Sequence, residues 1–172
     1  MLRTLRQLER TDGAEIAEAA LVLPLVFMFL LGIVWFGRAF NIYATVTQAA
    51  QQGAVTAAHP ICAVGCAGVF PTDAVVDNTI FAVLQASSLD PGQIVQPATP
   101  AALDCPAPIP NHSCSSTGKV VLCRAVVLNP STTPAQCGVV VTFQYPFQMN
   151  VPFTSLGSQI LLTGHAQARM EN

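Results

Sequence analysis

The chain has 172 residues, of which 52% are hydrophobic and only 9% are charged, and its formal net charge is -2. Nucleic-acid binding needs clustered Lys and Arg side chains, whereas only Lys119, Arg124 and Arg169 occur after residue 38. The composition therefore argues against a nucleic-acid-binding protein. It suits one membrane span with one small outer domain.

The apolar stretch comprises residues 19–37, nineteen uncharged residues between Glu18 and Arg38. At ~1.5 Å of rise per helical residue it reaches roughly 28 Å, close to the hydrocarbon thickness of a bilayer. We expect a transmembrane helix over residues 14–38, and membrane lipid is therefore a predicted partner.

Residues 1–13 precede this span and carry Arg3, Arg6 and Arg10. Lys and Arg close to a span hold that end in the cytoplasm, while acidic residues count little. The sequence thus predicts a cytoplasmic leader, a single pass through the cytoplasmic membrane, and a C-terminal domain that is periplasmic or extracellular.

Two simpler interpretations of the N-terminus remain open. An ordinary secretory signal has an apolar region of about 7 to 15 residues followed by a cleavage site between small residues. This run is longer, contains Pro24 and continues past Arg38 into a further helical pattern. An uncleaved signal anchor is the stronger alternative.

Glu18 separates a plain anchor from an assembly subunit. A carboxylate deep in a bilayer costs a few kcal/mol, so such residues usually have a partner or a task. Cleavage after Gly13 would create an amine at Ala14, one helical turn from Glu18. A neighbouring subunit's amine would then neutralise Glu18 during packing.

Residues 13–58 resemble the N-terminal signature of the TadE-like proteins, minor pseudopilins of the tight-adherence (Tad/Flp) branch of type IV pilus systems. The matching elements are Gly13, Glu18, LVLP at 21–24, LLGIVWFGRAF at 30–40 and QAAQQGA at 48–54. The resemblance implies a prepilin peptidase that cuts between Gly13 and Ala14, and partners among the pilins or pseudopilins of the same system. Family members commonly have Phe or Tyr after the glutamate, whereas Ala19 stands here.

The helical pattern continues through residues 39–58, so one helix is expected from about residue 14 to residue 58, ending before Pro60. One stripe of this helix carries Phe36, Phe40, Tyr43 and Ala50, and the next includes Gly53. We expect the chain's own C-terminal domain to cover the outer stripe, the alternative being a free docking face. In either case Gly53 permits close approach.

Residues 59–172 predict an antiparallel α+β head packed on the long helix, as in pilins. Thr72 and Asp73 begin a second helix that extends to about Ser87, and a turn at 89–92 leads to a short strand at 93–96. A proline-rich loop without regular structure is expected at about 97–118. Three strands are expected at 119–128, 138–147 and 158–170, with Pro146 at a strand end or edge.

All six cysteines follow the span, which agrees with an oxidising compartment outside the cytoplasm. They are Cys62, Cys66, Cys105, Cys114, Cys123 and Cys137. Fifteen pairings are possible, and we expect bridges between near neighbours: 62 with 66, 105 with 114, and 123 with 137. A metal site at His59, Cys62 and Cys66 is the alternative, but the second half of such a site is lacking, so no metal is predicted.

Catalytic motifs are absent from the sequence. His59, His112 and His165 are far apart in sequence, and there is no glycine-rich phosphate loop, GxSxG or HExxH. We predict a non-enzymatic protein without cofactor or small-molecule substrate. Two functions fit this prediction: a pilus assembly subunit cut after Gly13, or an uncleaved membrane-anchored binding module. A tethered periplasmic hydrolase is the form that an enzyme would take, with His112 or His165 as its catalytic base.

Overall fold

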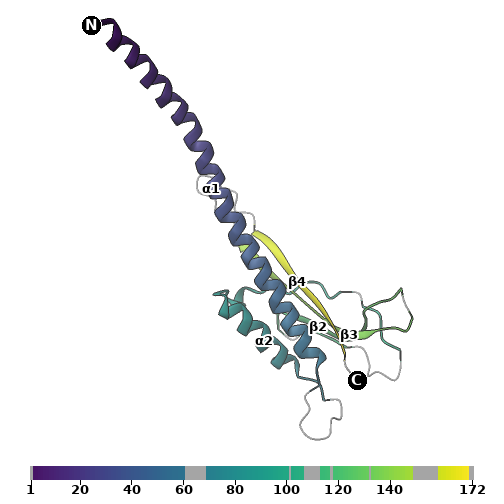
Figure 1. Cartoon of the computed structure of the whole chain (residues 1–172). Coiled ribbons are helices and arrows are strands. Elements are labelled where there is room, and N and C mark those ends of the chain that lie inside the picture. The colour runs from purple at the N-terminus through teal and green to yellow at the C-terminus, as the bar shows by residue number, and fades with distance from the viewer. Residues whose placement is uncertain are drawn as a thin grey trace. The chain divides into compact units, whose positions relative to one another are not determined.

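The fold is known from a computed structural model, which describes residues 2–60, 69–100, 102–106, 113–116, 118–131, 133–148 and 159–170, with side chains from residue 13 onward. The described residues form two α-helices, one 3₁₀ helix and a four-stranded antiparallel sheet. Figure 1 labels α1, α2, β2, β3 and β4. The predicted α+β class is confirmed. The elements are α1 (Leu2–Ala58), α2 (Asp73–Ala86), η1 (Pro91–Gln93), β1 (Ser113–Ser115), β2 (Val121–Val127), β3 (Cys137–Gln148) and β4 (Gln159–Arg169).

Helix α1 is a single α-helix of 57 residues. Its end at Ala58 agrees with the prediction and is followed by Pro60, which cannot donate a helical hydrogen bond. Its start at Leu2 is earlier than expected, since the leader was not predicted to be helical. The chain divides into two compact units, residues 1–40 and residues 41–172, so α1 contributes to both.

In the second unit, the sheet buries one face against the helices. The strand order is β1-β2-β3-β4, and the register of β3 with β4 runs unbroken from Gly138 opposite Arg169 to Gln148 opposite Gln159. Alternate residues of β3 belong to the same core as α1 and α2 because side chains of a strand alternate between faces. They are Val139, Val141, Phe143 and Tyr145.

Gly164 allows α1 to lie close to β4. A Cβ atom at this position would lie 2.9 Å from Val46 Cγ1, 3.0 Å from the Val46 carbonyl oxygen and 3.1 Å from Phe143 Cζ. Gly53 of α1 has a similar role toward α2, since a Cβ there would lie 2.7 Å from Ile80 Cδ1. The lack of a side chain at Gly164 therefore leaves room for α1.

Helix α2 packs on this core through one face, as its spacing predicted. Val76, Ile80 and Leu84, each one turn apart, are fully buried. The N-terminus of α2 is tied to β2 by Arg124, whose guanidinium pairs with the Asp73 carboxylate and donates a 2.7 Å hydrogen bond to the Pro71 carbonyl.

Strand β2 contains a bulge that divides its outer edge in two. The register with β3 shifts between Cys123 and Val126, and Ala125 has a left-handed φ of 56°. Beyond the bulge, residues 102–106 lie along β2, with Cys105 N donating to Ala125 O and Val127 N donating to Leu103 O. Before the bulge, β1 pairs with β2 in antiparallel orientation and therefore runs in the same direction as residues 102–106.

Two sequence predictions about loops are wrong. Residues 93–96 do not form a strand, because Asp90 accepts a 2.8 Å hydrogen bond from Gly92 N and caps η1, leaving only Val95 to bridge Gln144. The region 97–118 is not free of regular structure, because Ser113–Ser115 forms β1 on the edge of β2.

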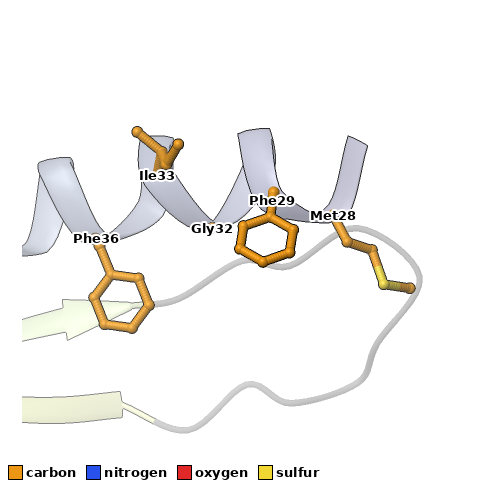
Figure 2. A pocket seen from close by; sticks show the side chains of 5 residues that line it. All are labelled: Met28, Phe29, Gly32, Ile33 and Phe36. Atoms are coloured by element: carbon orange, nitrogen blue, oxygen red, sulfur yellow. The ribbon is translucent and has the colours of Figure 1, made fainter. Parts of the chain in front are cut away.

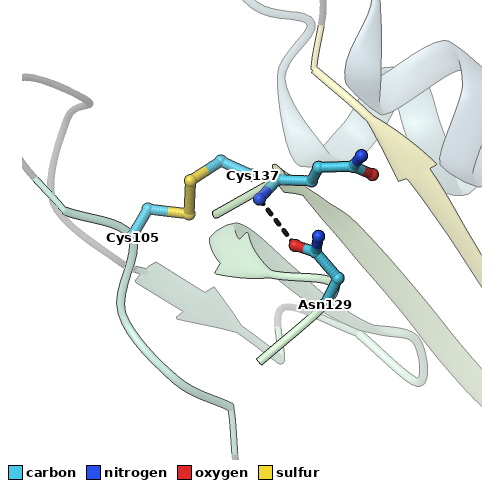
Figure 3. Close-up of a disulfide and its surroundings, with 4 residues drawn as sticks. Cys105, Asn129 and Cys137 are labelled. Atoms are coloured by element: carbon cyan, nitrogen blue, oxygen red, sulfur yellow. Dashed lines mark hydrogen bonds between the residues drawn. A yellow bond between two sulfur atoms is a disulfide. The ribbon is translucent and has the colours of Figure 1, made fainter. Parts of the chain in front are cut away.

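The predicted disulfide pairing is also wrong for four of the cysteines. Cys105 is bonded to Cys137, 32 residues away, and Cys114 to Cys123, nine residues away. The sheet register explains both, because Cys114 stands directly opposite Cys123, and Cys105 lies beside β2 within reach of the start of β3 (Figure 3). The predicted bond between Cys62 and Cys66 lies outside the described residues.

Candidate functional site

The candidate site is the apolar surface of α1 from Gly13 onward. This is the helix of the described chain that is long and apolar enough to cross a membrane. None of its large apolar side chains between Ile16 and Phe40 is buried, and most are more than half exposed. A surface this apolar and this exposed is suited to lipid or to other apolar helices.

Pro24 lies inside α1 without ending it. A proline removes one backbone donor and clashes with the preceding turn, which costs about 3 kcal/mol in the interior of a soluble helix. Helices that span membranes tolerate proline because neighbouring groups satisfy the freed carbonyls. Its presence is therefore compatible with a membrane-spanning segment.

The predicted cleavage-site residues lie on the exposed first part of this surface. Gly13, Ala14 and Glu18 are all exposed, and a Cβ atom at Gly13 would meet nothing within 4 Å. Glu15 is also exposed and lies three residues before Glu18, so the two carboxylates share a helix face. The sequence prediction did not consider Glu15.

The apolar surface of α1 has a shallow hollow at Gly32. Met28, Phe29, Gly32, Ile33 and Phe36 line a shallow hollow, in which the Phe29 and Phe36 rings lie on one side of the helix with the glycine between them (Figure 2). A Cβ atom at Gly32 would meet nothing within 4 Å. Small residues beside large ones allow close helix packing in membranes.

The five predicted helix-packing residues divide into two groups. Ala50 and Gly53 are buried against the head, whereas Phe36, Phe40 and Tyr43 are exposed, Phe36 by 77%. The buried face of α1 begins at Thr45 and Val46. The expectation that the head covers the whole stripe is therefore wrong at Tyr43, which belongs to the head unit and is 49% exposed.

Three ionisable groups of the head, Asp73, Asp77 and Tyr145, have pKa values that are shifted by their surroundings. Burial opposes ionisation of Asp73, but hydrogen bonds from Ser115 and Arg124 outweigh it and lower the pKa of Asp73. For Asp77, one turn further along α2, burial and then the negative charge of Asp73 raise the pKa to about 6. Burial likewise raises the pKa of Tyr145, whose hydroxyl accepts a 3.2 Å hydrogen bond from Asp90 N.

The alternative sites remain predictions or gain no support. Among the described residues, no three His, Cys, Asp or Glu side chains gather closely enough to hold a metal ion. Cys62, Cys66 and His112 lie outside the described residues. His165 has Thr142 Oγ1 at 3.0 Å and Gln167 Nε2 at 3.3 Å.

A comparison with protein families finds a match over the same part of α1. The family model described as TadE-like protein matches residues 13–55. The match begins at the glycine of the predicted cleavage site and ends where α1 is buried in the head, so it supports the TadE-like resemblance. No curated protein and no solved structure matches the chain.

The TadE-like region leaves most of the head unmatched. The sequence did not reveal the ion pair of Arg124 with Asp73, because 51 residues separate the two side chains and their meeting depends on the register of β2. A weak signal existed: Arg124 is the one charged residue in an otherwise apolar strand. Charges in such positions usually have a partner.

Proposed function

We propose that this chain is a non-enzymatic subunit of pilus assembly, a TadE-like minor pseudopilin of a Tad/Flp system. A prepilin peptidase removes residues 1–13, and the mature helix packs with pilins or pseudopilins in the cytoplasmic membrane. The observation that carries the proposal is the exposed apolar surface of α1 between Ile16 and Phe40, which lies within the family match at residues 13–55.

Glu18 is proposed to pair with the amine at Ala14 of a neighbouring subunit. The carboxylate lies at the mouth of the apolar segment, where taking it into lipid uncompensated costs a few kcal/mol. A positive amine beside it offsets that cost. The pairing therefore favours assembled over isolated subunits.

Glu15 offers a matched control for this pairing. Both side chains are exposed, so neither Glu18→Ala nor Glu15→Ala disturbs a packed core. We expect Glu18→Ala to leave expression and membrane insertion unchanged while pilus number falls, and Glu15→Ala to have the smaller effect. Piliation can be counted by electron microscopy beside a membrane-fraction immunoblot.

The outcome of this experiment also addresses the alternative function. Unchanged piliation in Glu18→Ala cells would remove the pairing role. If deletion of the whole chain also leaves pili intact, the chain is an uncleaved membrane-anchored binding module, whose disulfide-braced head meets a partner outside the cell.

A further inference from the structure

Strand β4 changes in polarity along its length. Two consecutive residues near its beginning, Ile160 and Leu161, are large and apolar and are 44% and 46% exposed. Successive side chains of a strand point to opposite faces of the sheet, so these two expose apolar surface on both faces. The exposed residues further along the strand are polar, namely Thr163, His165, Gln167 and Arg169.

The beginning of β4 lies at the end of the head where α1 enters it. A Cβ atom at Gly164 would lie 2.9 Å from Val46 Cγ1, so β4 and α1 are in contact at these two residues. Figure 1 shows that α1 and β4 run in the same direction through the head. Residues of β4 before Gly164 therefore lie toward Asn41, the first residue of the head unit.

The two elements cover different distances along this shared direction. A strand rises by about 3.3 Å per residue and a helix by about 1.5 Å. The step from Gly164 back to Ile160 thus spans roughly 13 Å, whereas the step from Val46 back to Asn41 spans roughly 7.5 Å. The beginning of β4 therefore extends past the level of Asn41.

The outer end of the apolar segment of α1 is close to this level. Arg38 follows the uncharged run of residues 19–37, and Asn41 lies only about 4.5 Å further along the helix. With residues 19–37 in the hydrocarbon, the end of the head that contains Asn41 lies at the headgroup layer. Tyr43 is 49% exposed near the same end, and tyrosine is enriched where proteins meet the membrane–water interface.

We propose that the beginning of β4 is a second membrane contact of this chain, in which Ile160 and Leu161 enter the headgroup layer beside α1. Lipid is the occupant because exposed large apolar residues of β4 are confined to the end nearest the span. A protein partner on the sheet would have no reason to favour that end. The contact gives the head a second anchor and so restricts its tilt relative to the membrane. This inference rests on α1 as a membrane span, which the proposed function also needs, but not on cleavage or pilus assembly.

Quenching by brominated lipid tests the contact in the full-length chain. Trp35 is the single tryptophan of the sequence, so Trp35→Phe provides a background for Leu161→Trp. In phospholipid vesicles, bromine on the lipid acyl chains should quench the tryptophan at this position. Thr163→Trp is the matched control, because Thr163 is exposed two residues further along the same face of β4, and it should be quenched less. Equal quenching at the two positions, or none at either, would overturn the proposal.

Photo-crosslinking keeps the proposal testable if the tryptophan variants fail to fold. A benzophenone-bearing amino acid in place of Leu161 should yield, in illuminated cells, an adduct with the mass of the chain plus a phospholipid. The same amino acid in place of Thr163 should yield less of this adduct. An adduct with a second copy or with another protein, in place of lipid, would assign the surface to a protein partner and overturn the proposal.

The mass of the adduct also separates this contact from the proposed function. The lipid adduct is expected whether or not residues 1–13 have been removed. A retained leader with a lipid adduct would count against the proposed function alone. A cleaved chain without a lipid adduct would count against the membrane contact of β4 alone.

Discussion

Gly164 is the residue at which helix and sheet approach most closely. A methyl group there would meet the backbone oxygen of Val46, which cannot rotate away, whereas one at Gly53 would meet side chains alone, with Ile80 Cδ1 and Cγ1 both 2.7 Å away. Alanine also gains about 1 kcal/mol over glycine inside a helix, as at Gly53. Gly164→Ala should therefore lower the free energy of unfolding by about 1–3 kcal/mol, and Gly53→Ala by less.

Thermal unfolding of the detergent-solubilised chain, followed by circular dichroism, tests whether Gly164→Ala lowers the unfolding midpoint more than Gly53→Ala does. Equal midpoints for Gly164→Ala and the unchanged protein would mean that α1 does not rest on β4 as described.

Asp77 gives stability an unusual pH dependence. Its pKa is raised to about 6 in the folded chain, while an unfolded aspartate titrates near ~3.9. Between these values the folded state binds a proton that the unfolded state has lost, so the free energy of unfolding rises as pH falls from about 7 to about 5. Asp73 has the opposite sign, because its pKa is lowered, and its contribution is lost only below about pH 4.

Denaturant midpoints at pH 7 and pH 5 test this account. The unchanged protein should be more stable at pH 5, and Asp77→Asn should abolish the gain. A gain that persists in Asp77→Asn would assign the effect to another group.

At the scale of elements, hydrophobic periodicity predicted α2 through its one buried face, and runs of apolar residues predicted the three long strands. Val76, Ile80 and Leu84 are one turn apart on α2, and alternate residues of β3 belong to the core. Strands β2 and β3 also bury side chains on the opposite face of the sheet, among them Cys123 and Val140. Elements that depend on distant partners were missed. Strand β1 is a three-residue strand that forms only against β2, and η1 depends on the cap at Asp90.

The bonds Cys105–Cys137 and Cys114–Cys123 were missed because they depend on how distant strands are aligned. Cys114 stands opposite Cys123 in the register of β1 with β2, and the bulge at Ala125 shifts the register of β2 with β3 by one residue. No local sequence pattern predicts the bulge, since Ala125 is not a residue type that favours a left-handed conformation. In the candidate site, by contrast, Gly13, Glu18 and the apolar run lie close together in sequence, so the sequence alone was enough to propose them.

The shallow hollow at Gly32 is a place on α1 where a partner helix can pack closely. Nothing within the described chain lies close to Gly32 or Gly37, so leucine at either position fits the isolated chain. If another helix enters the hollow between Phe29 and Phe36, Gly32→Leu should reduce pilus number, while Gly37→Leu, five residues along, should not. The two variants are compared by counting pili in cells that contain equal amounts of the membrane-inserted protein. Equal counts for Gly32→Leu and Gly37→Leu would show that no helix occupies the hollow.

At the scale of the whole molecule, the chain combines an apolar helix with a head that has its own core. The head packs against one face of α1 from Thr45 onward, whereas the large apolar side chains of the first unit between Ile16 and Phe40 are not buried. In the proposed function, these exposed side chains are the surface that contacts lipid and neighbouring helices.

In the proposed function, assembly depends on cleavage after Gly13, because cleavage would create the amine that is proposed to pair with Glu18. Gly13→Leu provides the control, since the exposed position has space for the side chain and the substitution leaves the fold intact. The mass of the intact chain, purified from cells with an active prepilin peptidase, measures the step directly. The account predicts a chain beginning at Ala14, and the full leader retained in Gly13→Leu; a chain that still begins at Met1 in piliated wild-type cells would contradict it.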